Sequence, residues 1–270
     1  MSVSAVTVTY RTGPCLRDCL YALKADPEID EIIIVDNGNA DAEAQFIQRF
    51  VAETAKARWI ETGANIGFAR AANIGAREAA GAHLLFINPD AVIRWRSVSR
   101  MVAAAEERDG PVIVGGKIFG LDGAEQRGGR RHTLTLPRAL GLTRWTLEDR
   151  PEPKEPIVVG AVSGGFFLCS RKDFISLGEF DEDYFLHVED LDLCRRVHEA
   201  GGSVIYQPAA AALHYGSTSD APNLFVETHK AAGLKRYFVK FAKGPFSRMG
   251  AHTFGSLIGL VLVNRARRRS

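Results

Sequence analysis

The first half of the chain alternates short apolar runs with longer segments of helical composition. The apolar runs are rich in β-branched residues and stop at turn-forming sequences, which predicts buried strands at residues 3–9, 31–35, 58–61 and 84–87. The other segments predict helices at about residues 15–25, 40–57, 69–80 and 97–108. This alternation predicts an α/β fold with a Rossmann-like, mostly parallel central sheet flanked by helices.

The second half of the chain has a different pattern. Residues 123–131 (GAEQRGGRR) have the composition of a flexible loop, and residues 148–156 (EDRPEPKEP) that of a proline-rich charged linker. From Val158 onward the predicted strands are shorter and their connections longer, as in an added subdomain.

The last residues combine an apolar stretch with a basic end. FGSLIGLVLV, residues 254–263, has about half the length that a bilayer-spanning helix needs, and RARRRS follows it. Such a helix can lie in the interface of an anionic membrane leaflet. It can equally pack on the domain with its basic end in water, and the sequence leaves both interpretations open.

Composition narrows the class of protein. The chain has 270 residues and a formal net charge of only +2, which does not suggest a nucleic-acid partner. Its four cysteines form no CxxC pair, so we expect small core residues in a reducing compartment. The first residues, MSVSAVTVTY, lack the basic and small-residue regions of a signal peptide, so we expect a cytoplasmic protein.

Polar motifs follow several of the predicted strands. Asp36 ends EIIIV and can accept hydrogen bonds from a base edge or ribose hydroxyls. Asn65 and Gly67 precede a helix whose amino end could face a phosphate, and Arg70 in its first turn adds a cation. Each motif alone is explained by turn chemistry, but their shared position at strand ends favours a nucleotide site. Without GxGxxG, a dinucleotide cofactor is poorly supported.

Asp90 follows the strand LLFI directly, after Asn88 and Pro89. Proline cannot donate to a sheet ladder, so the strand must end near Asn88 and deliver Asp90 to the carboxyl edge. Asp90 could simply cap the next helix, or it could bind a divalent cation together with substrate phosphates. A possible companion is His214 in LHYGST, and imidazole with carboxylate suits Mn²⁺ better than Mg²⁺.

A third group of residues lies in the second half of the chain. HVEDLDLCRRV, residues 187–197, has apolar residues at helical spacing and predicts an amphipathic helix with Glu189 and Asp190 in its first turn. There the helix dipole favours negative charge, but a carboxylate at a cleft can also act as a general base. Upstream, Gly164 and Gly165 in SGGFF could let the backbone approach a sugar, or form a tight turn before a core strand.

The order of these motifs resembles a known family. TVTYR, VDNG, NIGFARAAN, LFINPDA, SGGFFLCSRKDF, GEFDEDYFLHVEDLDLCRRV and LHYGST are similar to the inverting glycosyltransferases of family 2, with the GT-A fold, and to their rhamnosyltransferase-like branch. The resemblance covers roughly residues 3–219. It implies that residues 1–120 bind the nucleotide sugar and that residues 121–220 form the acceptor and catalytic half. Residues 221–270 match no motif of the family, and we expect them to form a C-terminal helical segment that could associate with a membrane.

The resemblance also implies roles for residues of the donor side. Thr9, Tyr10 and Arg11 would line the nucleotide pocket, and Asp36 would contact the base or its ribose. The segment that packs against the nucleotide would include Asn65, Gly67 and Asn73. In the family's Asp-x-Asp motif, Asn88 holds the first position, and Asp90 is the metal-coordinating carboxylate.

On the acceptor side, the resemblance implies that Asp190 is the catalytic base and Glu189 its neighbour. His214 would help bind the metal or the diphosphate, and Gly164 and Gly165 would form the acceptor loop. The implied cofactor is Mg²⁺ or Mn²⁺. The implied substrates are a dTDP- or UDP-sugar, with dTDP-rhamnose favoured, and a saccharide or lipid-linked acceptor of cell-surface polysaccharide synthesis.

Two other classes of function remain open at this point. A non-catalytic sugar-nucleotide or glycan-binding module could share the fold, but it would not need a base such as Asp190. A nucleotidyltransferase would need a glycine-rich phosphate loop with lysine near the N-terminus, which this chain lacks. A membrane-facing tail would fit a lipid-linked acceptor at the inner face of the cell membrane.

Overall fold

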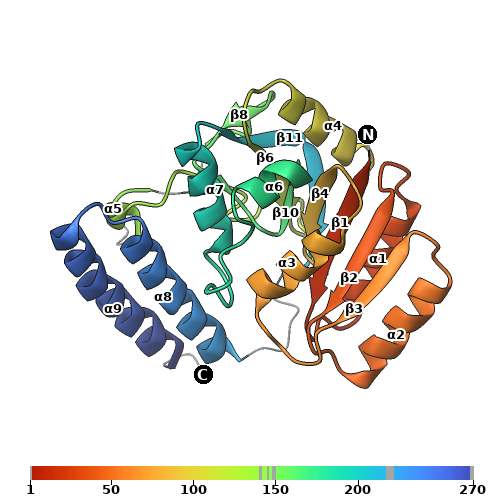
Figure 1. Cartoon of the computed structure of the whole chain (residues 1–270), viewed down its shortest axis with the longest axis horizontal. Helices are drawn as coiled ribbons and strands as arrows, with labels where there is room; N and C mark the ends of the chain where they lie inside the picture. The colour runs from red at the N-terminus through yellow and green to blue at the C-terminus, as the bar shows by residue number, and fades with distance from the viewer. Residues whose placement is uncertain (1, 140–141, 145, 148–149, 217–221, 268–270) are drawn as a thin grey trace.

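The computed structural model describes residues 2–139, 142–144, 146–147, 150–216 and 222–267. A mixed sheet runs through this part of the chain in the order β3-β2-β1-β4-β10-β6-β11-β5, and β8 also pairs with β11 (Figure 1). Its strands are β1 Val3–Thr9, β2 Glu31–Asp36, β3 Ala57–Glu61, β4 His83–Ile87, β5 Ala91–Ile93, β6 Val112–Phe119, β8 Ile157–Val158, β10 Phe166–Ser170 and β11 Ser203–His214. A second, two-stranded sheet pairs β7 Arg130–Arg131 with β9 Ala161–Val162.

The first four strands pair in parallel, as the alternation of strands and helices predicts. β10 enters antiparallel between β4 and β6, so a strand from the second half of the chain completes the middle of the sheet. β11 pairs with β6 in parallel and with β5 antiparallel. The sequence had not predicted β5 or β6.

Both faces of the sheet are covered by helices, and the strands are buried on both sides. Val6 and Val8 of β1 belong to one core and Val3 and Ala5 to the other, as the period of two in a strand requires. The helices α1 Cys15–Ala25, α2 Asp41–Ala52 and α4 Ser97–Glu106 contribute to one core. The helices α3 Phe68–Glu78, α6 Arg171–Ser176 and α7 Glu189–Glu199 contribute to the other. A short helix, α5, spans Leu136–Ala139.

The predicted elements agree with the structure except at some boundaries. The amphipathic helix is α7, and its apolar stripe of Val188, Leu191, Cys194 and Val197 is buried. The helix predicted to reach Ala57 ends instead at Ala52. Ala57 already pairs with Ile32 of β2, so strand pairing overrides the helical propensity of this alanine-rich stretch. All four cysteines are free thiols.

The C-terminal segment forms a hairpin of two helices, α8 Asn223–Lys240 and α9 Pro245–Arg267. The hairpin lies on the side of α7 that faces away from β1–β3 (Figure 1). Gly255 of α9 packs against Lys235 of α8, and Gly259 packs against Ala231. Among the helices in the described part of the chain, none is long and apolar enough to cross a membrane.

Close approach of α3 to the sheet positions the loop that precedes this helix. Gly75 faces β1 and β2, and a Cβ atom there would lie 2.6 Å from Val6 Cγ1 and 2.9 Å from Val35 Cγ2. Such contacts are shorter than van der Waals distance, so the helix can sit at this depth only with glycine.

We therefore expect Gly75→Ala to lower the free energy of unfolding by about 1–3 kcal/mol, because the added methyl group overpacks the core. Gly250→Ala in α9 is the matched control, since no described heavy atom lies within 4 Å of the added Cβ. It should raise stability by about 0.5–1 kcal/mol through helix propensity. Urea unfolding measures both, and an unchanged midpoint for Gly75→Ala would contradict the packing argument.

Candidate active site

Strand pairing brings most of the predicted site residues to one edge of the sheet. In the parallel pair of β1 and β2, Thr9 lies opposite Asp36. In the antiparallel pair of β5 and β11, His214 lies opposite Ala91, which places it beside Asp90. The first residues of β10 reach the same edge, where Asn88 N donates to Gly165 O at 2.9 Å.

Asp36 is held by the turn that follows its strand. Its Oδ1 accepts hydrogen bonds from Gly38 N at 3.0 Å, from Asn39 N at 2.9 Å and from Asn39 Nδ2 at 2.9 Å. Within the described residues no hydrogen bond reaches Oδ2. Asp36 thus has one oxygen fixed by the protein and a second oxygen that can accept from a ligand hydroxyl or base edge.

Tyr10 and Arg11 lie next to this turn. The Arg11 guanidinium lies 5.4 Å from the centre of the half-buried Tyr10 ring, and the Arg11 side chain is exposed. Arg11 has a positive φ of 48°, and its N–H donates to Asn39 Oδ1 at 2.6 Å. Behind them the buried Thr9 hydroxyl contacts that of Thr12 at 3.0 Å. In such an arrangement the aromatic ring can stack on a pyrimidine base, and the guanidinium can contact a phosphate.

Asn65 and Gly67 belong to a loop that is fixed from two directions. Asn65 Oδ1 accepts from Asn37 Nδ2 at 3.0 Å and from Gly67 N at 3.1 Å. Gly67 has a φ of 90°, and a Cβ there would lie 2.7 Å from Phe185 O. Phe68 N donates to the same carbonyl at 2.7 Å. The loop of Asn65 and Gly67 therefore touches the segment that leads into α7.

Two other predicted residues, Asn73 and Arg70, contact the loop before α7. Asn73 is buried, and its side chain binds the backbone of Phe180. Asn73 Nδ2 donates to Phe180 O at 2.9 Å, and Phe180 N donates to Asn73 Oδ1 at 3.0 Å. It therefore joins α3 to the loop before α7. Arg70 is exposed and forms a long ion pair with Glu182, at 3.7 Å.

Asp90 and His214 form the part of the site that could hold a metal ion. Asp90 Oδ1 lies 3.1 Å from His214 Nε2, and Asn88 Nδ2 lies 3.2 Å from the same nitrogen. Gln126 contacts His214 twice. Gln126 Oε1 lies 2.7 Å from the ring nitrogen Nδ1, and Gln126 Nε2 donates to the backbone carbonyl of His214 at 2.7 Å. Because Oε1 can only accept, we assign the ring proton to Nδ1.

This tautomer leaves a lone pair on His214 Nε2, facing a carboxylate oxygen of Asp90. That lone pair can accept from Asn88 Nδ2, which lies 3.2 Å away. An imidazole nitrogen beside a carboxylate oxygen is also a ligand pair that suits a divalent ion such as Mn²⁺. In the described part of the chain no cluster of three or more His, Cys, Asp or Glu side chains could hold a metal. Water and substrate phosphates would supply the remaining ligands.

Asp190 lies at the amino end of α7 and is paired with Arg131 from β7. Arg131 Nη2 lies 2.6 Å from Asp190 Oδ2, and Gly164 N donates to the same oxygen at 3.0 Å. Burial disfavours the charged carboxylate, but the charge and hydrogen bond of Arg131 and the N–H groups of Gly164 and Leu191 outweigh it and lower the pKa of Asp190. Asp190 is therefore ionised and directed at the loop of Gly164 and Gly165.

Glu189 differs from its neighbour. It is buried, and its Oε2 has no hydrogen-bond partner among the described residues. Burial and the negative charge of Asp190 raise its pKa, which favours the protonated form near neutral pH. The two adjacent carboxyl groups thus have different charge states.

Three residues of the site were missed by sequence reasoning: Asn39, Gln126 and Arg131. Asn39 follows the VDNG motif and could have been inferred from its turn chemistry. Gln126 and Arg131 lie in the glycine-rich stretch that predicts a flexible loop, and they act on residues 88 and 59 positions away. No local signal indicates such partners.

Comparison with known proteins places the chain in a family. The family model for glycosyl transferase family 2 matches residues 4–178. The N-acetylglucosaminyl-diphospho-decaprenol L-rhamnosyltransferase of Mycobacterium tuberculosis is 32% identical over 264 residues, which cover 88% of this chain and 83% of that protein. The rhamnosyltransferase WbbL of Escherichia coli is 27% identical over 229 residues, covering 79% and 83%.

Solved structures agree on the fold. The mannosyltransferase PcManGT of Pyrobaculum calidifontis, solved with GDP-Man and Mn²⁺, superposes with a TM-score of 0.62 over 98% of this chain and 73% of that chain, at 16% identity. This likeness confirms the GT-A fold that the motifs had implied. The chain therefore belongs to glycosyl transferase family 2 and is rhamnosyltransferase-like within that family.

Proposed function

We propose that the protein transfers L-rhamnose from dTDP-rhamnose to a lipid-linked saccharide that carries N-acetylglucosamine diphosphate, in cell-surface polysaccharide synthesis. The observation that carries this proposal is the ionised Asp190, held by Arg131 and Gly164 beside the edge where Asp36 and Asp90 lie. The names of the relatives support the choice of donor sugar and acceptor.

The proposed reaction is a single displacement that inverts the anomeric carbon. Asp190 accepts the proton of an acceptor hydroxyl while that oxygen attacks the sugar from the face opposite the nucleotide. Arg131 keeps Asp190 ionised and fixes its orientation. Because its low pKa makes Asp190 a weak base, the proton moves as the new bond forms and the hydroxyl becomes acidic. A base also argues against a purely glycan-binding module.

Donor binding is assigned to residues 1–120 and acceptor binding to residues 121–220. Asp36, Tyr10 and Arg11 would hold the base and ribose, and the loop of Asn65 and Gly67 would lie against the nucleotide. Asp90 and His214 would hold Mn²⁺ or Mg²⁺, which when bound neutralises charge on the diphosphate leaving group.

The function is tested by a transfer assay with dTDP-rhamnose and a prenyl diphosphate carrying N-acetylglucosamine. We expect turnover by the wild type and a loss of about 10²–10⁴-fold in kcat for Asp190→Asn, which removes the base. In Arg131→Met the pKa of Asp190 should rise, so the acid limb of the pH profile of kcat/KM moves to higher pH.

Arg131→Lys is the control for that shift, because it keeps the positive charge and should leave the acid limb closer to its wild-type position. Asp190→Asn with wild-type turnover would refute the base. A wild type that transfers from UDP- or GDP-sugars but not from dTDP-rhamnose would refute the donor.

Metal binding is tested separately by calorimetry with dTDP, UDP and GDP, with and without Mn²⁺ or Mg²⁺. We expect dTDP to bind more tightly in the presence of metal. Asp90→Asn or His214→Ala should lower this enhancement of affinity by at least about tenfold, because each variant loses a metal ligand. His252→Ala, at an exposed position of α9, is the matched control. Equal metal enhancement in Asp90→Asn and the wild type would rule out this site.

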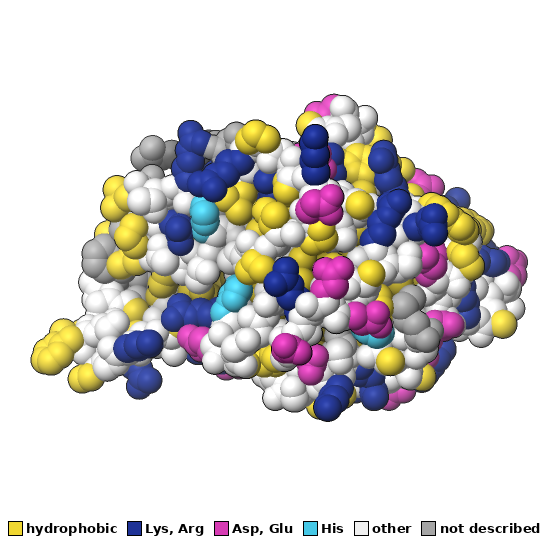
Figure 2. All heavy atoms as spheres, turned by 90° about the horizontal axis from the view of Figure 1, so that it is seen from above, with side chains coloured by type: hydrophobic (Ala, Val, Ile, Leu, Met, Phe, Trp, Pro, Cys, Tyr) yellow, Lys and Arg dark blue, Asp and Glu magenta, His cyan; other side chains and the backbone are white. Residues whose placement is uncertain are grey.

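The C-terminal hairpin is proposed to contact the membrane that holds the acceptor. One side of α9 packs on α8 through Gly255 and Gly259, whereas Phe246, Met249 and Leu257 are 84%, 65% and 55% exposed. The surface seen from above in Figure 2 mixes basic, acidic and apolar side chains. Positive charge is concentrated in the sequence RARRRS at residues 265–270, and a basic cluster attracts anionic lipids.

We expect the wild type to sediment with phosphatidylcholine vesicles that contain phosphatidylglycerol. The double variant Phe246→Ser/Met249→Ser should bind them at least about tenfold more weakly, because two apolar side chains no longer enter the interface. Leu121→Ser is the control, since Leu121 is 78% exposed but lies in a distant loop. Equal sedimentation of the double variant and the wild type would refute membrane contact through α9.

A further inference from the structure

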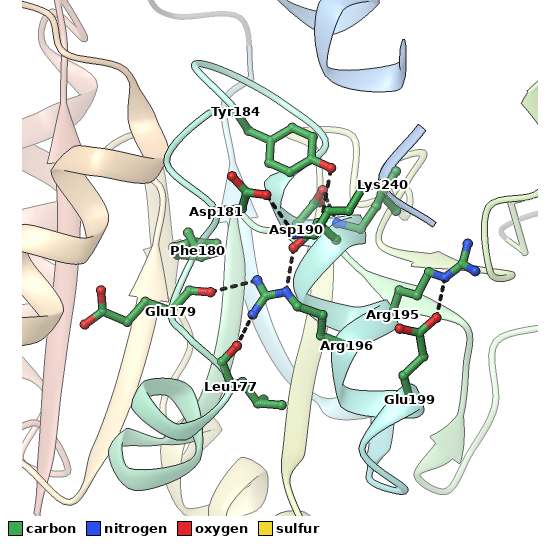
Figure 3. A network of polar contacts seen from close by, with 12 residues as sticks. Leu177, Glu179, Phe180, Asp181, Tyr184, Asp190, Arg195, Arg196, Glu199 and Lys240 are labelled. Atoms are coloured by element: carbon green, nitrogen blue, oxygen red, sulfur yellow. Dashed lines mark hydrogen bonds and ion pairs between the residues drawn. The ribbon is translucent and has the colours of Figure 1, made fainter. Parts of the chain in front are cut away.

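The C-terminal hairpin is also connected to the interior of the enzyme by a network of charged groups. Figure 3 shows part of it, in which Arg196 of α7 reaches back to the backbone of Leu177 and Glu179. Those two hydrogen bonds measure 2.6 and 2.7 Å. The loop between α6 and α7 is thereby attached to the helix that carries Asp190.

Lys240 of the hairpin contacts both the loop and α7. It is the last residue of α8, and its Nζ lies 2.7 Å from Asp181 Oδ2 and 2.6 Å from Asp192 Oδ1. Asp181 belongs to the loop before α7, whereas Asp192 belongs to α7 itself. The ammonium group of Lys240 thus links α8 to both the loop before α7 and α7 itself, which lie elsewhere in the sequence.

Asp192 needs this cation because it is fully buried. Its Oδ2 accepts from Arg196 Nε at 2.6 Å, and its Oδ1 accepts from Tyr184 OH at 3.2 Å in addition to Lys240. Buried carboxylates are destabilising unless they are paired and hydrogen-bonded. Without Lys240, Oδ1 would keep only the neutral tyrosine donor.

Asp181 has a similar arrangement on the loop side. Arg236, one helical turn before Lys240, pairs with Asp181 at 2.9 Å and with Asp183 at 2.7 Å. The same loop continues through Phe185, whose carbonyl accepts from Phe68 N and lies against Gly67. The loop of residues 177–187 therefore contacts the loop around Gly67 and also leads into α7, the helix that carries Asp190.

We propose that Lys240 is a positioning residue for catalysis, which fixes the loop of residues 177–187 against α7 so that the base and the donor-side loop keep their relative placement. The inference rests on the proposed transferase function for its kinetic consequence only. Lys240 touches neither substrate nor Asp190. It acts through Asp181 and Asp192, and small misplacements of a base lower turnover strongly.

Lys240→Met tests this assignment. We expect kcat in the transfer assay to fall by about ten- to a hundredfold in protein that is still folded, as misplacement of catalytic groups predicts. Lys240→Arg should restore most of kcat, because a guanidinium can also bind two carboxylates. Lys243→Met is the matched control, since Lys243 is exposed and makes no ion pair within the described residues, and it should behave as wild type.

Hydrogen exchange gives a readout that does not depend on the transferase reaction. The amides of Phe180 and Tyr184 donate to Asn73 Oδ1 and Asp181 O, so they are protected when the loop is fixed. In Lys240→Met they should exchange faster while amides of β1 and β2 remain unchanged. If Lys240→Met does not fold, Asp181→Asn, which loosens only the loop side, should give the same local increase and a smaller loss of kcat.

The outcomes separate the two proposals. A wild type without transferase activity, combined with faster local exchange in Lys240→Met, would refute the proposed function and keep the structural link. Folded Lys240→Met with wild-type kcat and wild-type exchange would refute the positioning role. Uniformly faster exchange with unchanged kcat of the folded protein would show a general stabilising role and also refute it.

Discussion

Register between strands is the constraint on which this site depends. The strands β1, β2 and β4 run in parallel, so their last residues meet at one edge regardless of the length of the helices between them. The antiparallel partners then add residues from far along the chain, because His214 lies opposite Ala91 and Phe166 lies opposite Ile87. A slip of one residue would turn His214 to the other face of the sheet and remove it from Asp90.

The neighbouring carboxyl groups at the start of α7 differ in their surroundings. The pKa of Asp190 is lowered beside Arg131, and Asp192 is paired with Arg196 and Lys240. Among the described residues no cation pairs with Glu189, and burial together with the charge of Asp190 raises its pKa. Separate environments for adjacent carboxyl groups are how proteins assign distinct proton states to them. Removing one partner of such a buried pair costs about 3–5 kcal/mol of stability.

The sequence predicted those features that depend on local pattern or on strand ends. Buried apolar runs and turn residues located the four parallel strands. His214 could be named only as a possible companion of Asp90, and the structure places the two side chains 3.1 Å apart. The predicted end of α2 was wrong, because pairing of Ala57 with β2 overrides the local helical propensity. The contact of Arg131 with Asp190 could not be predicted, since it depends on how β7 pairs with β9.

The backbone at the start of α7 is strained, and the C-terminal hairpin packs against it. His187 and Val188, directly before Glu189, have φ values of 66° and 77°. A β-branched residue such as Val188 rarely adopts this conformation, which costs about 1–3 kcal/mol and persists only where the surroundings enforce it. The surroundings of this turn include α8. Gly233 approaches so closely that a Cβ would lie 3.1 Å from both His187 O and Val188 Cγ2. Asp190, the turn before it and Gly233 all lie outside the matched residues 4–178, so the family model covers neither the candidate base nor the helix that packs on its turn.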